Sequence, residues 1–235
     1  MNRSSTEVCL SSPAETRDAQ RYLDAILEIL HRFTTRESLD RVAKAASVIA
    51  DALRKGRRVH LLDNGHFLGN EFYQRAGGVP FLHRIQLDDL KEPAVVRSQD
   101  VLIVASVSGR SSEVVDGAML ARERGVYVMA LTSLSQSQAA PPLHPSGKRL
   151  YECADLVLDI GGVPGDGLLD FPNVKYRFGP ASGISSAVLL WMVLAQTVGN
   201  LLNSGIYPTI FPSVNIPGGA EAFQEALADF ERRGI

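Results

Sequence analysis

The chain has 235 residues, 45% of them hydrophobic and 21% charged, which is enough for one α/β domain with a full core. Its net charge of −2 and the absence of a basic run argue against nucleic acid as the main partner. The only two cysteines, Cys9 and Cys153, show no metal-ligand spacing. We therefore expect no disulfide framework, no bound metal and a cytoplasmic location.

Two amphipathic helices are predicted before the first strand. Apolar residues recur at helical spacing from Tyr22 to Phe33, and again from Leu39 to Leu53. Residues 1–18 lack a continuous apolar core, so we interpret them as a loose leader and not as a signal peptide. The leading helices then occupy residues 19–55.

Five short apolar runs predict the strands of one sheet. They are residues 59–62, 81–87, 101–105, 126–131 and 156–160. We expect a helical segment as far as Arg75 after the first strand, and a long polar loop after the fourth. Strands separated by helical patterns are typical of right-handed βαβ units. The prediction is a flavodoxin-like three-layer αβα sandwich with a mainly parallel five-stranded sheet.

The chain beyond the last strand is predicted to end in two more helices. A glycine-rich turn and a short excursion through Tyr176 lead to a helix at about residues 184–202. Its most apolar stretch, residues 187–195, is too short to cross a bilayer, so we interpret it as a buried helix and expect no membrane partner. Residues 206–235 form a C-terminal extension with a proline-containing tail and an amphipathic helix.

Residues 101–113 combine a buried strand, a polar loop and a helix start. An anion in this loop would meet free backbone N–H groups and the positive end of the helix. Four hydroxyls would add to these, from Ser106, Ser108, Ser111 and Ser112. Gly109 can adopt backbone angles closed to other residues, and Ser111 or Ser112 can cap the helix. An ordinary serine-rich turn has the same composition, so the loop alone leaves both interpretations open.

A second polar loop follows the first strand. It contains Asn64, Gly65 and His66, with Glu71 shortly after. If the first and third strands are neighbours, the two loops meet at the carboxyl ends of the strands, where open α/β sheets bind ligands. Glu71 could then act as a general base next to a carbonyl, and His66 as an acid, a base or a hydrogen-bond donor. The alternatives are a solvated Glu71 and a capping or exposed His66.

Two further residues are weaker candidates for substrate binding. Asp166 lies in the glycine-rich turn, where a structural role is the alternative, and Lys148 lies in the long loop, where a solvated charge is. The first loop lacks a GxGxxG sequence, and the chain contains no GK[ST] sequence. We therefore expect neither a dinucleotide cofactor nor a nucleotide P-loop, and no cofactor is predicted.

The loop at residues 106–113, SVSGRSSE, resembles the SxSGxTxE signature of sugar isomerase (SIS) domains, with Ser111 in the place of the threonine. In that family the loop binds the phosphate of a phosphosugar, which implies the same role here for the loop serines, Gly109 and Arg110. Similarity to SIS proteins described as sugar isomerase-like extends over nearly the whole chain after about residue 20. The first loop departs from the wider family at Asn64, where Gly or Ser is frequent, and at Phe67, where Ser is common.

The residues and the resemblance together predict one SIS domain over residues 1–235, with its sheet and flanking helices at residues 56–205. The expected activity is aldose–ketose isomerisation of a phosphosugar through an enediol, with Glu71 and His66 as the catalytic pair. A phosphosugar lyase or etherase is the alternative chemistry, and a non-catalytic phosphosugar sensor is the alternative class. The resemblance also implies a homodimer or a dimer of dimers.

Overall fold

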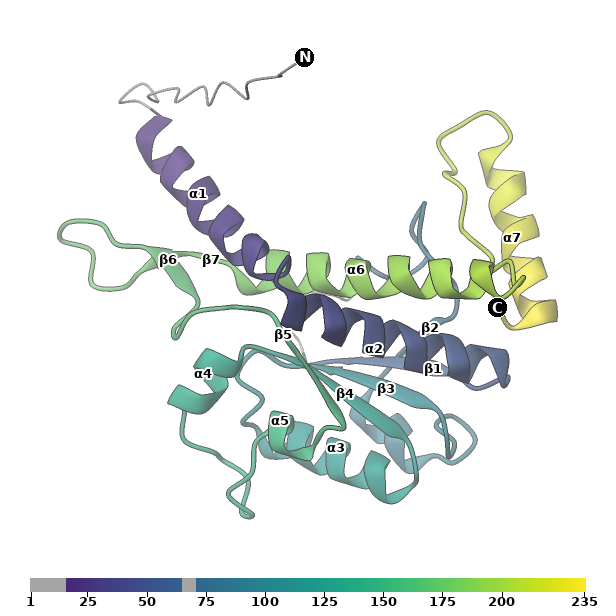
Figure 1. Ribbon diagram of the computed structural model, residues 1–235, viewed down its shortest axis with the longest axis horizontal. Helices are drawn as coiled ribbons and strands as arrows, with labels where there is room; N and C mark the ends of the chain where they lie inside the picture. The colour runs from purple at the N-terminus through teal and green to yellow at the C-terminus, as the bar shows by residue number, and fades with distance from the viewer. Residues whose placement is uncertain (1–15, 65–70) are drawn as a thin grey trace.

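The computed structural model describes residues 16–64 and 71–235, and a five-stranded sheet forms its centre (Figure 1). The strand order is β2-β1-β3-β4-β5, and every neighbouring pair is parallel. The strands are β1 (Val59–Asp63), β2 (Leu82–Ile85), β3 (Val101–Ala105), β4 (Tyr127–Thr132) and β5 (Leu156–Asp159). This order places β1 beside β3, so the predicted flavodoxin-like sheet is confirmed.

The central strand β3 is buried along its whole length. Its residues alternate between two apolar clusters: Ile103 packs in the cluster under α6 (Ser182–Asn203), and Leu102 packs in the cluster under α3 (Ser112–Glu123). Because helices cover both faces of the sheet, neither side of β3 can remain polar. The five consecutive apolar residues of this strand follow directly from that position.

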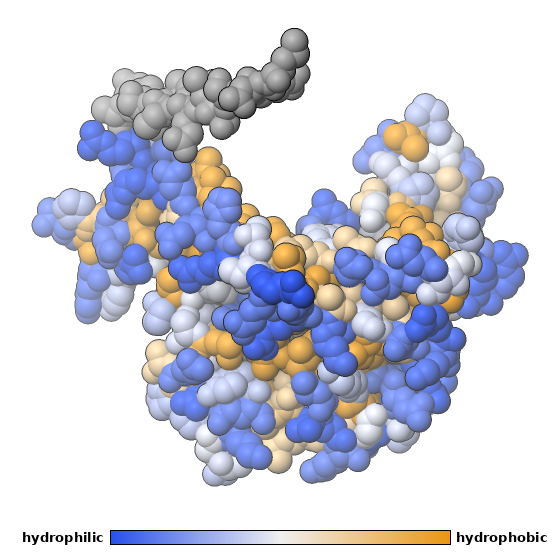
Figure 2. Space-filling model, in the orientation of Figure 1, coloured by the Kyte–Doolittle hydropathy of each residue, from blue (hydrophilic) through white to orange (hydrophobic). Residues whose placement is uncertain are grey.

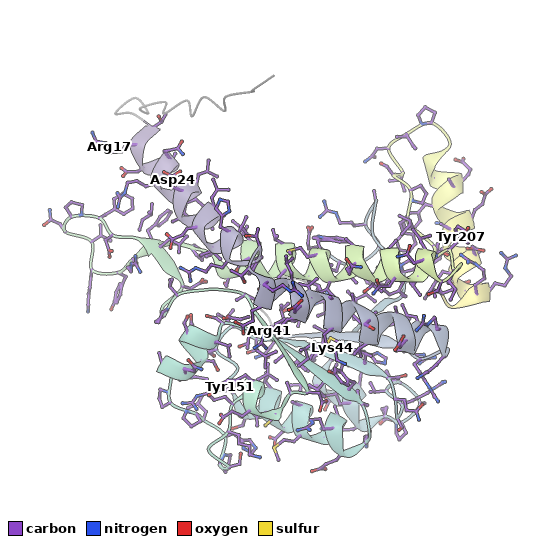
Figure 3. All side chains as sticks on the ribbon, viewed as in Figure 1. Arg17, Asp24, Arg41, Lys44, Tyr151 and Tyr207 are labelled. Atoms are coloured by element: carbon purple, nitrogen blue, oxygen red, sulfur yellow. The ribbon has the colours of Figure 1, made fainter. Side chains whose placement is uncertain are left out.

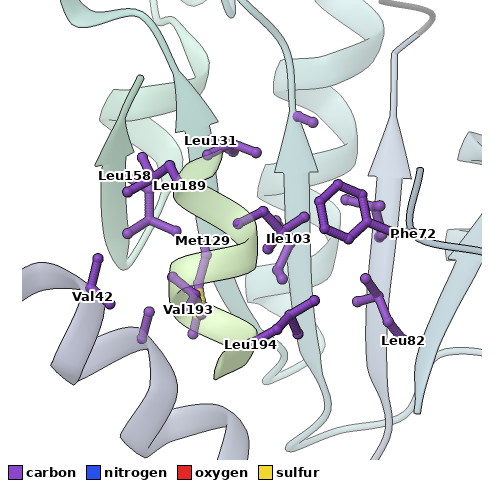
Figure 4. Close-up of a cluster of buried hydrophobic side chains, with 14 of the residues drawn as sticks. Val42, Phe72, Leu82, Ile103, Met129, Leu131, Leu158, Leu189, Val193 and Leu194 are labelled. Carbon is purple, nitrogen blue, oxygen red and sulfur yellow. The ribbon is translucent and has the colours of Figure 1, made fainter. Parts of the chain in front are cut away.

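The helices form a layer on each face of the sheet. On one face α6 packs beside α2 (Arg36–Arg54), and the other face carries α3, the short helix α5 (Leu150–Cys153) and the 3-10 helix η2 (Leu87–Lys91). Figure 4 shows Leu189, Val193 and Leu194 of α6 against the side chains of β3 and β4. Each such leucine stabilises the fold by about 1.5–3 kcal/mol when fully buried.

Helix α2 is also tied to the edge of the sheet by a polar contact. Arg41, labelled in Figure 3, reaches from α2 to β5, where its guanidinium donates to the carbonyl oxygen of Val157 at 3.2 Å. Among the described residues, α6 is the one helix long and apolar enough to span a bilayer, yet 44% of its most apolar window is buried inside the protein. One side of α6 therefore packs in the core, and its other side faces outward.

Two helices project away from the sheet at opposite ends of α6. They are α1 (Arg17–Arg32), beside the short hairpin of β6 (Gly167–Leu169) and β7 (Phe178–Pro180), and α7 (Gly219–Arg233) (Figure 1). Figure 2 shows a hollow between them with apolar residues on its floor. We call the surface formed by α1, the outward side of α6 and α7 the saddle.

The structure differs from the predicted secondary structure in several places. Residues 71–75 form turns and bends and not a helix, with Gln74 at a positive φ of 45°; residues 65–70 lie outside the described part of the chain. The long loop after β4 contains the helix α4 (Leu134–Ala139), whose start is capped by the Ser133 hydroxyl. The hairpin of β6 and β7 was not predicted, because strands of three residues carry too little alternation to be recognised.

Candidate functional site

The loop at residues 106–112 connects the carboxyl end of β3 to the start of α3, as the sequence predicted. Gly109 has a φ of 56°, in the left-handed region. A Cβ atom on Gly109 would lie only 2.8 Å from the Cβ of Leu150, so a side chain is excluded by space as well as by conformation. The expected backbone conformation of Gly109 is confirmed.

Neighbouring segments hold this loop from behind through its backbone. The N–H groups of Leu150 and Leu143 donate to the carbonyl oxygens of Gly109 and Arg110, at 2.7 and 3.2 Å. His144 extends the support, because its Nε2 lies 3.0 Å from a carboxylate oxygen of Asp116 on α3. The loop is thus fixed by protein contacts on its far side, so little ordering remains to oppose the binding of a ligand.

The β4 side of the loop is fixed in the same way. The Thr132 hydroxyl and the Ser133 backbone N–H both donate to the carbonyl oxygen of Val107, each at 3.0 Å. Ser106 is almost completely buried, and its N–H donates to Leu131 at 3.1 Å. Thr132 and Ser133 were not predicted as part of the site, because only strand order brings the end of β4 next to the loop.

The hydroxyls of Ser111 and Ser112 do not cap α3, contrary to the sequence-based expectation. Ser111 occupies the cap position by its backbone angles, but its side chain accepts no bond from the helix. Its Oγ is buried and has no hydrogen-bond partner among the described residues. Ser112 donates to the carbonyl oxygen of Leu143 at 3.3 Å. Neither hydroxyl therefore caps the first turn of α3, and its backbone N–H groups suit an anion.

The first loop approaches this site from the neighbouring strand. The N–H of Asn64 donates to the carbonyl oxygen of Ala105 at 3.1 Å, which places the end of β1 directly beside Ser106. Two predicted site residues, Gly65 and His66, lie outside the residues that the structure describes. The described part of the first loop thus joins the serine loop at the predicted edge of the sheet.

Glu71 is held by two side chains and is only 34% exposed. The indole N–H of Trp191 on α6 donates to Oε1 at 2.9 Å, and Arg75 forms an ion pair with Oε2. The ring of Phe72 packs on that of Trp191, with centroids 4.6 Å apart. Figure 4 shows Phe72 near the carboxyl ends of the strands, beside the strand of Ile103. Glu71 therefore lies on the α6 side of the sheet, near the carboxyl ends of the strands.

Sequence reasoning missed both partners of Glu71. Arg75 follows it by four residues, a spacing that permits a side-chain contact even in this irregular segment. Trp191 is 120 residues away, and no local pattern connects the two. The only signal was the presence of one tryptophan in the whole chain, on a helix otherwise rich in aliphatic residues.

Asp166 and Lys148, the two weaker candidates, make contacts outside the serine loop. The carboxylate of Asp166 accepts bonds from the N–H groups of Ala181 and Ser182 and from the Ser182 hydroxyl, so its described contacts are those of a helix cap. Lys148 is exposed, and its backbone N–H donates to Ser146 at 3.3 Å. Neither placement brings a functional group into contact with the serine loop.

A buried group of titratable residues lies at the other end of the sheet. His60 on β1 contacts the Asp100 carboxylate at 3.1 Å, and both side chains are 1% exposed. Burial, followed by the nearby His60, lowers the pKa of His83 on β2 to about 4. Asp100 precedes β3, away from the carboxyl ends, so this group is not part of the candidate site. Within residues 16–64 and 71–235 no cluster of His, Cys, Asp and Glu could hold a metal ion.

Comparison with known proteins identifies the family. A protein-family model described as the SIS domain matches residues 21–92 and 88–133. A UPF0309 protein of Listeria innocua is 32% identical over 236 residues, covering 88% of this chain and 93% of that protein. The chain belongs to the UPF0309 family of SIS-domain proteins. A UPF0309 protein of Geobacillus kaustophilus is 34% identical, with 90% and 94% covered. The resemblance inferred from residues 106–113 is confirmed.

Solved structures share the SIS fold. The "putative phosphosugar isomerase involved in capsule formation" of Bacteroides fragilis superposes with a TM-score of 0.56 at 16% identity, covering 91% of this chain and 95% of that one. A phosphoheptose isomerase from Francisella tularensis gives a TM-score of 0.51 at 15% identity, with 79% and 98% covered. At these identities the likeness establishes the α/β fold of this UPF0309 protein and does not identify its ligand.

Proposed function

We propose that this protein binds a phosphosugar at the carboxyl ends of β1 and β3, with its phosphate in the loop at residues 106–112. The observation that carries the proposal is the Ser111 hydroxyl at the start of α3, whose oxygen is buried and has no partner among the described residues. A buried hydroxyl without a partner costs about 1–3 kcal/mol, and a ligand that accepts its hydrogen bond would recover that cost. A phosphate supplies such acceptors and suits the helix end.

The proposed reaction is aldose–ketose isomerisation. Glu71 would remove the proton next to the sugar carbonyl, and return of the proton to the neighbouring carbon would complete the conversion through an enediol. The phosphate serves as an anchor, because its binding energy orients the reacting carbons without taking part in the chemistry. We propose His66 as the second member of the pair and Asn64, Gly65 and Lys148 as further substrate contacts.

Two other functions share the phosphate site. A phosphosugar lyase or etherase would begin with the same proton removal by Glu71. A non-catalytic sensor is favoured by one observation: both carboxylate oxygens of Glu71 are already engaged, by Trp191 and Arg75. Exchange of a carbon-bound proton with solvent separates the two enzymes from the sensor, because a sensor breaks no C–H bond.

We further propose that two copies pair through the saddle, as a homodimer or within a dimer of dimers in the cytoplasm. Four large apolar side chains on the bordering helices are between 42% and 49% exposed: Leu23, Leu27, Ile184 and Leu202. Exposed apolar side chains on these two helices favour an interaction surface, and a two-fold axis lets the same surface cover itself. In this proposal residues 1–235 act as a single domain whose leading helices and C-terminal extension border the interface.

Calorimetry with sugar phosphates and their unphosphorylated counterparts tests the anchor. We expect measurable heats for one or more aldose 5- or 6-phosphates and none for the matching free sugars at equal concentration. Ser108→Ala should weaken phosphosugar binding by about 1–3 kcal/mol through a lost charge-assisted hydrogen bond. Equal affinity for the phosphorylated and free sugars would remove the phosphate role of Ser106, Ser108 and Ser111.

A further inference from the structure

The contact between Trp191 and Glu71 joins two elements of different rigidity. Glu71 lies in a segment of turns and bends, in which Gln74 adopts a positive φ of 45°. Trp191 lies in the tenth position of the 22-residue helix α6, which packs along α2 and whose first turn is capped by Asp166. The indole N–H is therefore a donor fixed by a helix, directed at a carboxylate on an irregular segment.

Arg75 cannot fix the carboxylate in the same way. It belongs to the same irregular segment as Glu71, and its side chain is 49% exposed, so it gives the carboxylate no anchor outside that segment. An exposed ion pair of this kind contributes little to holding one geometry. The indole of Trp191 also packs on Phe72, so one side chain contacts two consecutive residues of the segment. The position of Glu71 over the sheet thus depends on α6.

We propose that Trp191 is a positioning residue for Glu71. Its N–H binds Oε1 and sets the direction of the carboxylate, which leaves Oε2 as the oxygen that receives the substrate proton once Arg75 has turned away. In that step the C–H bond breaks, its electron pair moves toward the sugar carbonyl and the proton joins Oε2. The inference rests on the proposed role of Glu71 as the base.

Trp191→Phe is the main test, because it removes the N–H donor and retains an aromatic ring for the contact with Phe72. Probes are aldopentose 5-phosphates and aldohexose 6-phosphates in D₂O, with NMR following loss of the carbon-bound proton next to the carbonyl. We expect exchange to slow by about 10- to 100-fold, because a misplaced base loses much of its advantage. The calorimetric Kd for the same sugar phosphate should change less than about threefold, since the indole does not contact the phosphate loop. Met192→Leu, the neighbouring substitution on α6, should retain the wild-type exchange rate.

A second measurement detects the hydrogen bond between Trp191 and Glu71 and does not require turnover. Trp191 is the only tryptophan, so ¹⁵N-labelled protein gives a single indole N–H signal. We expect Glu71→Ala to shift this signal and to speed its exchange with water, because the indole loses its acceptor. An indole signal unchanged by Glu71→Ala would overturn the proposal.

The outcomes separate this inference from the proposed function. If Glu71→Gln abolishes exchange while Trp191→Phe exchanges at the wild-type rate, the base is confirmed and the positioning role is overturned. If Trp191→Phe loses exchange and phosphosugar affinity together, the indole has a general structural role and the positioning role is again overturned. If the wild-type protein exchanges no proton of any sugar phosphate that it binds, the isomerase proposal is wrong and this inference is wrong with it.

Discussion

The carboxylate of Asp166 accepts hydrogen bonds from the backbone N–H and the hydroxyl of Ser182, at 3.0 and 2.7 Å. A third bond comes from the N–H of Ala181 at 3.1 Å. The cap position of α6 is Ala181, which has no side-chain acceptor, so a residue 15 positions earlier satisfies the start of the helix. Asp166 has a φ of 62°, which Asp tolerates better than most residues. This contact fixes the end of α6 nearest the turn at residues 161–167.

Asp166→Ala should lower the free energy of unfolding by about 1–2 kcal/mol, because the first turn of α6 loses its only side-chain acceptor. Asp166→Asn should cost less, since its amide oxygen can still accept. Urea denaturation measures both, and Asp170→Ala, which removes an exposed pair with Arg177, is the control. An unfolding free energy in Asp166→Ala equal to that of the control would show that the three bonds contribute nothing net.

Ser111→Ala should weaken ligand binding without lowering the stability of the ligand-free protein. Removing a buried hydroxyl that has no partner should leave the free energy of unfolding of the ligand-free protein unchanged or slightly higher. Affinity for a sugar phosphate should fall by about 1–3 kcal/mol, because the charge-assisted bond to the phosphate is lost. Urea denaturation and calorimetry give the two values.

Ser112→Ala is the matched control for that substitution, since its hydroxyl already donates to Leu143 within the protein. It should affect binding less than Ser111→Ala does. The ligand role of Ser111 is refuted if its loss destabilises the free protein and leaves the Kd unaltered.

Glu71→Gln should leave phosphosugar affinity within a few-fold and abolish turnover. Gln has nearly the same shape as Glu, but its amide cannot take a proton from carbon, and a positioned base typically supplies roughly 10²–10⁴ in rate. Proton exchange in D₂O, followed by NMR, is the direct measurement. Persistence of wild-type exchange would exclude Glu71 as the base and make His66→Gln the next variant to assay.

Pairing through the saddle predicts a dimer at micromolar concentration by light scattering. Leu27→Glu should dissociate it, because a charge would be buried in an apolar contact while the helix propensity of α1 is preserved. Leu143→Glu is the control: this leucine is 55% exposed but lies beside α3, on the opposite face of the sheet. A monomeric wild-type protein, or a Leu27→Glu protein that remains dimeric, contradicts pairing through this surface.

His83 should make stability depend on pH in mildly acid solution. Burial, with the nearby His60, lowers the pKa of His83 from 6.5 to about 4 in the folded protein. Between these pH values the unfolded chain binds a proton that the folded protein does not, so the free energy of unfolding should fall as the pH drops from about 6.5 to 4. Denaturation at several pH values should show this slope, and His83→Gln should flatten it.

Asp100 affects only the acid end of that measurement. Burial raises the pKa of its carboxyl, but hydrogen bonds from His60 and from the N–H groups of Arg58 and Arg97 outweigh burial and hold the pKa below 3.8. The loss of its stabilisation begins near pH 5 and continues below 3.8, so it overlaps only the acid end of the His83 window. A His83→Gln protein with the full wild-type slope between pH 4 and 6.5 would show that another group causes the dependence.

The sequence by itself determined the strands, the outer helices and the serine loop. Residues 101–105 of β3 are apolar without interruption, which only a strand buried on both faces requires, and the predicted bounds match. Gly109 indicated the left-handed turn because few other residues adopt it, and the serines around it carried the SIS resemblance. These features are local, so neighbouring residues along the chain were sufficient to predict them.

Only the tertiary structure decided which polar groups are free and which are occupied. Glu71 meets Trp191 across 120 residues, and Asp166 meets Ser182 across 16, and neither pairing has a period or a motif that a sequence displays. Ser111 and Ser112 are adjacent and chemically identical, yet one hydroxyl is bonded to Leu143 and the other has no described partner. Near Arg75 the predicted helix is replaced by turns and bends, in which Phe72 packs against Trp191 of α6. Such contacts depend on how the elements pack, which no single segment of the chain specifies.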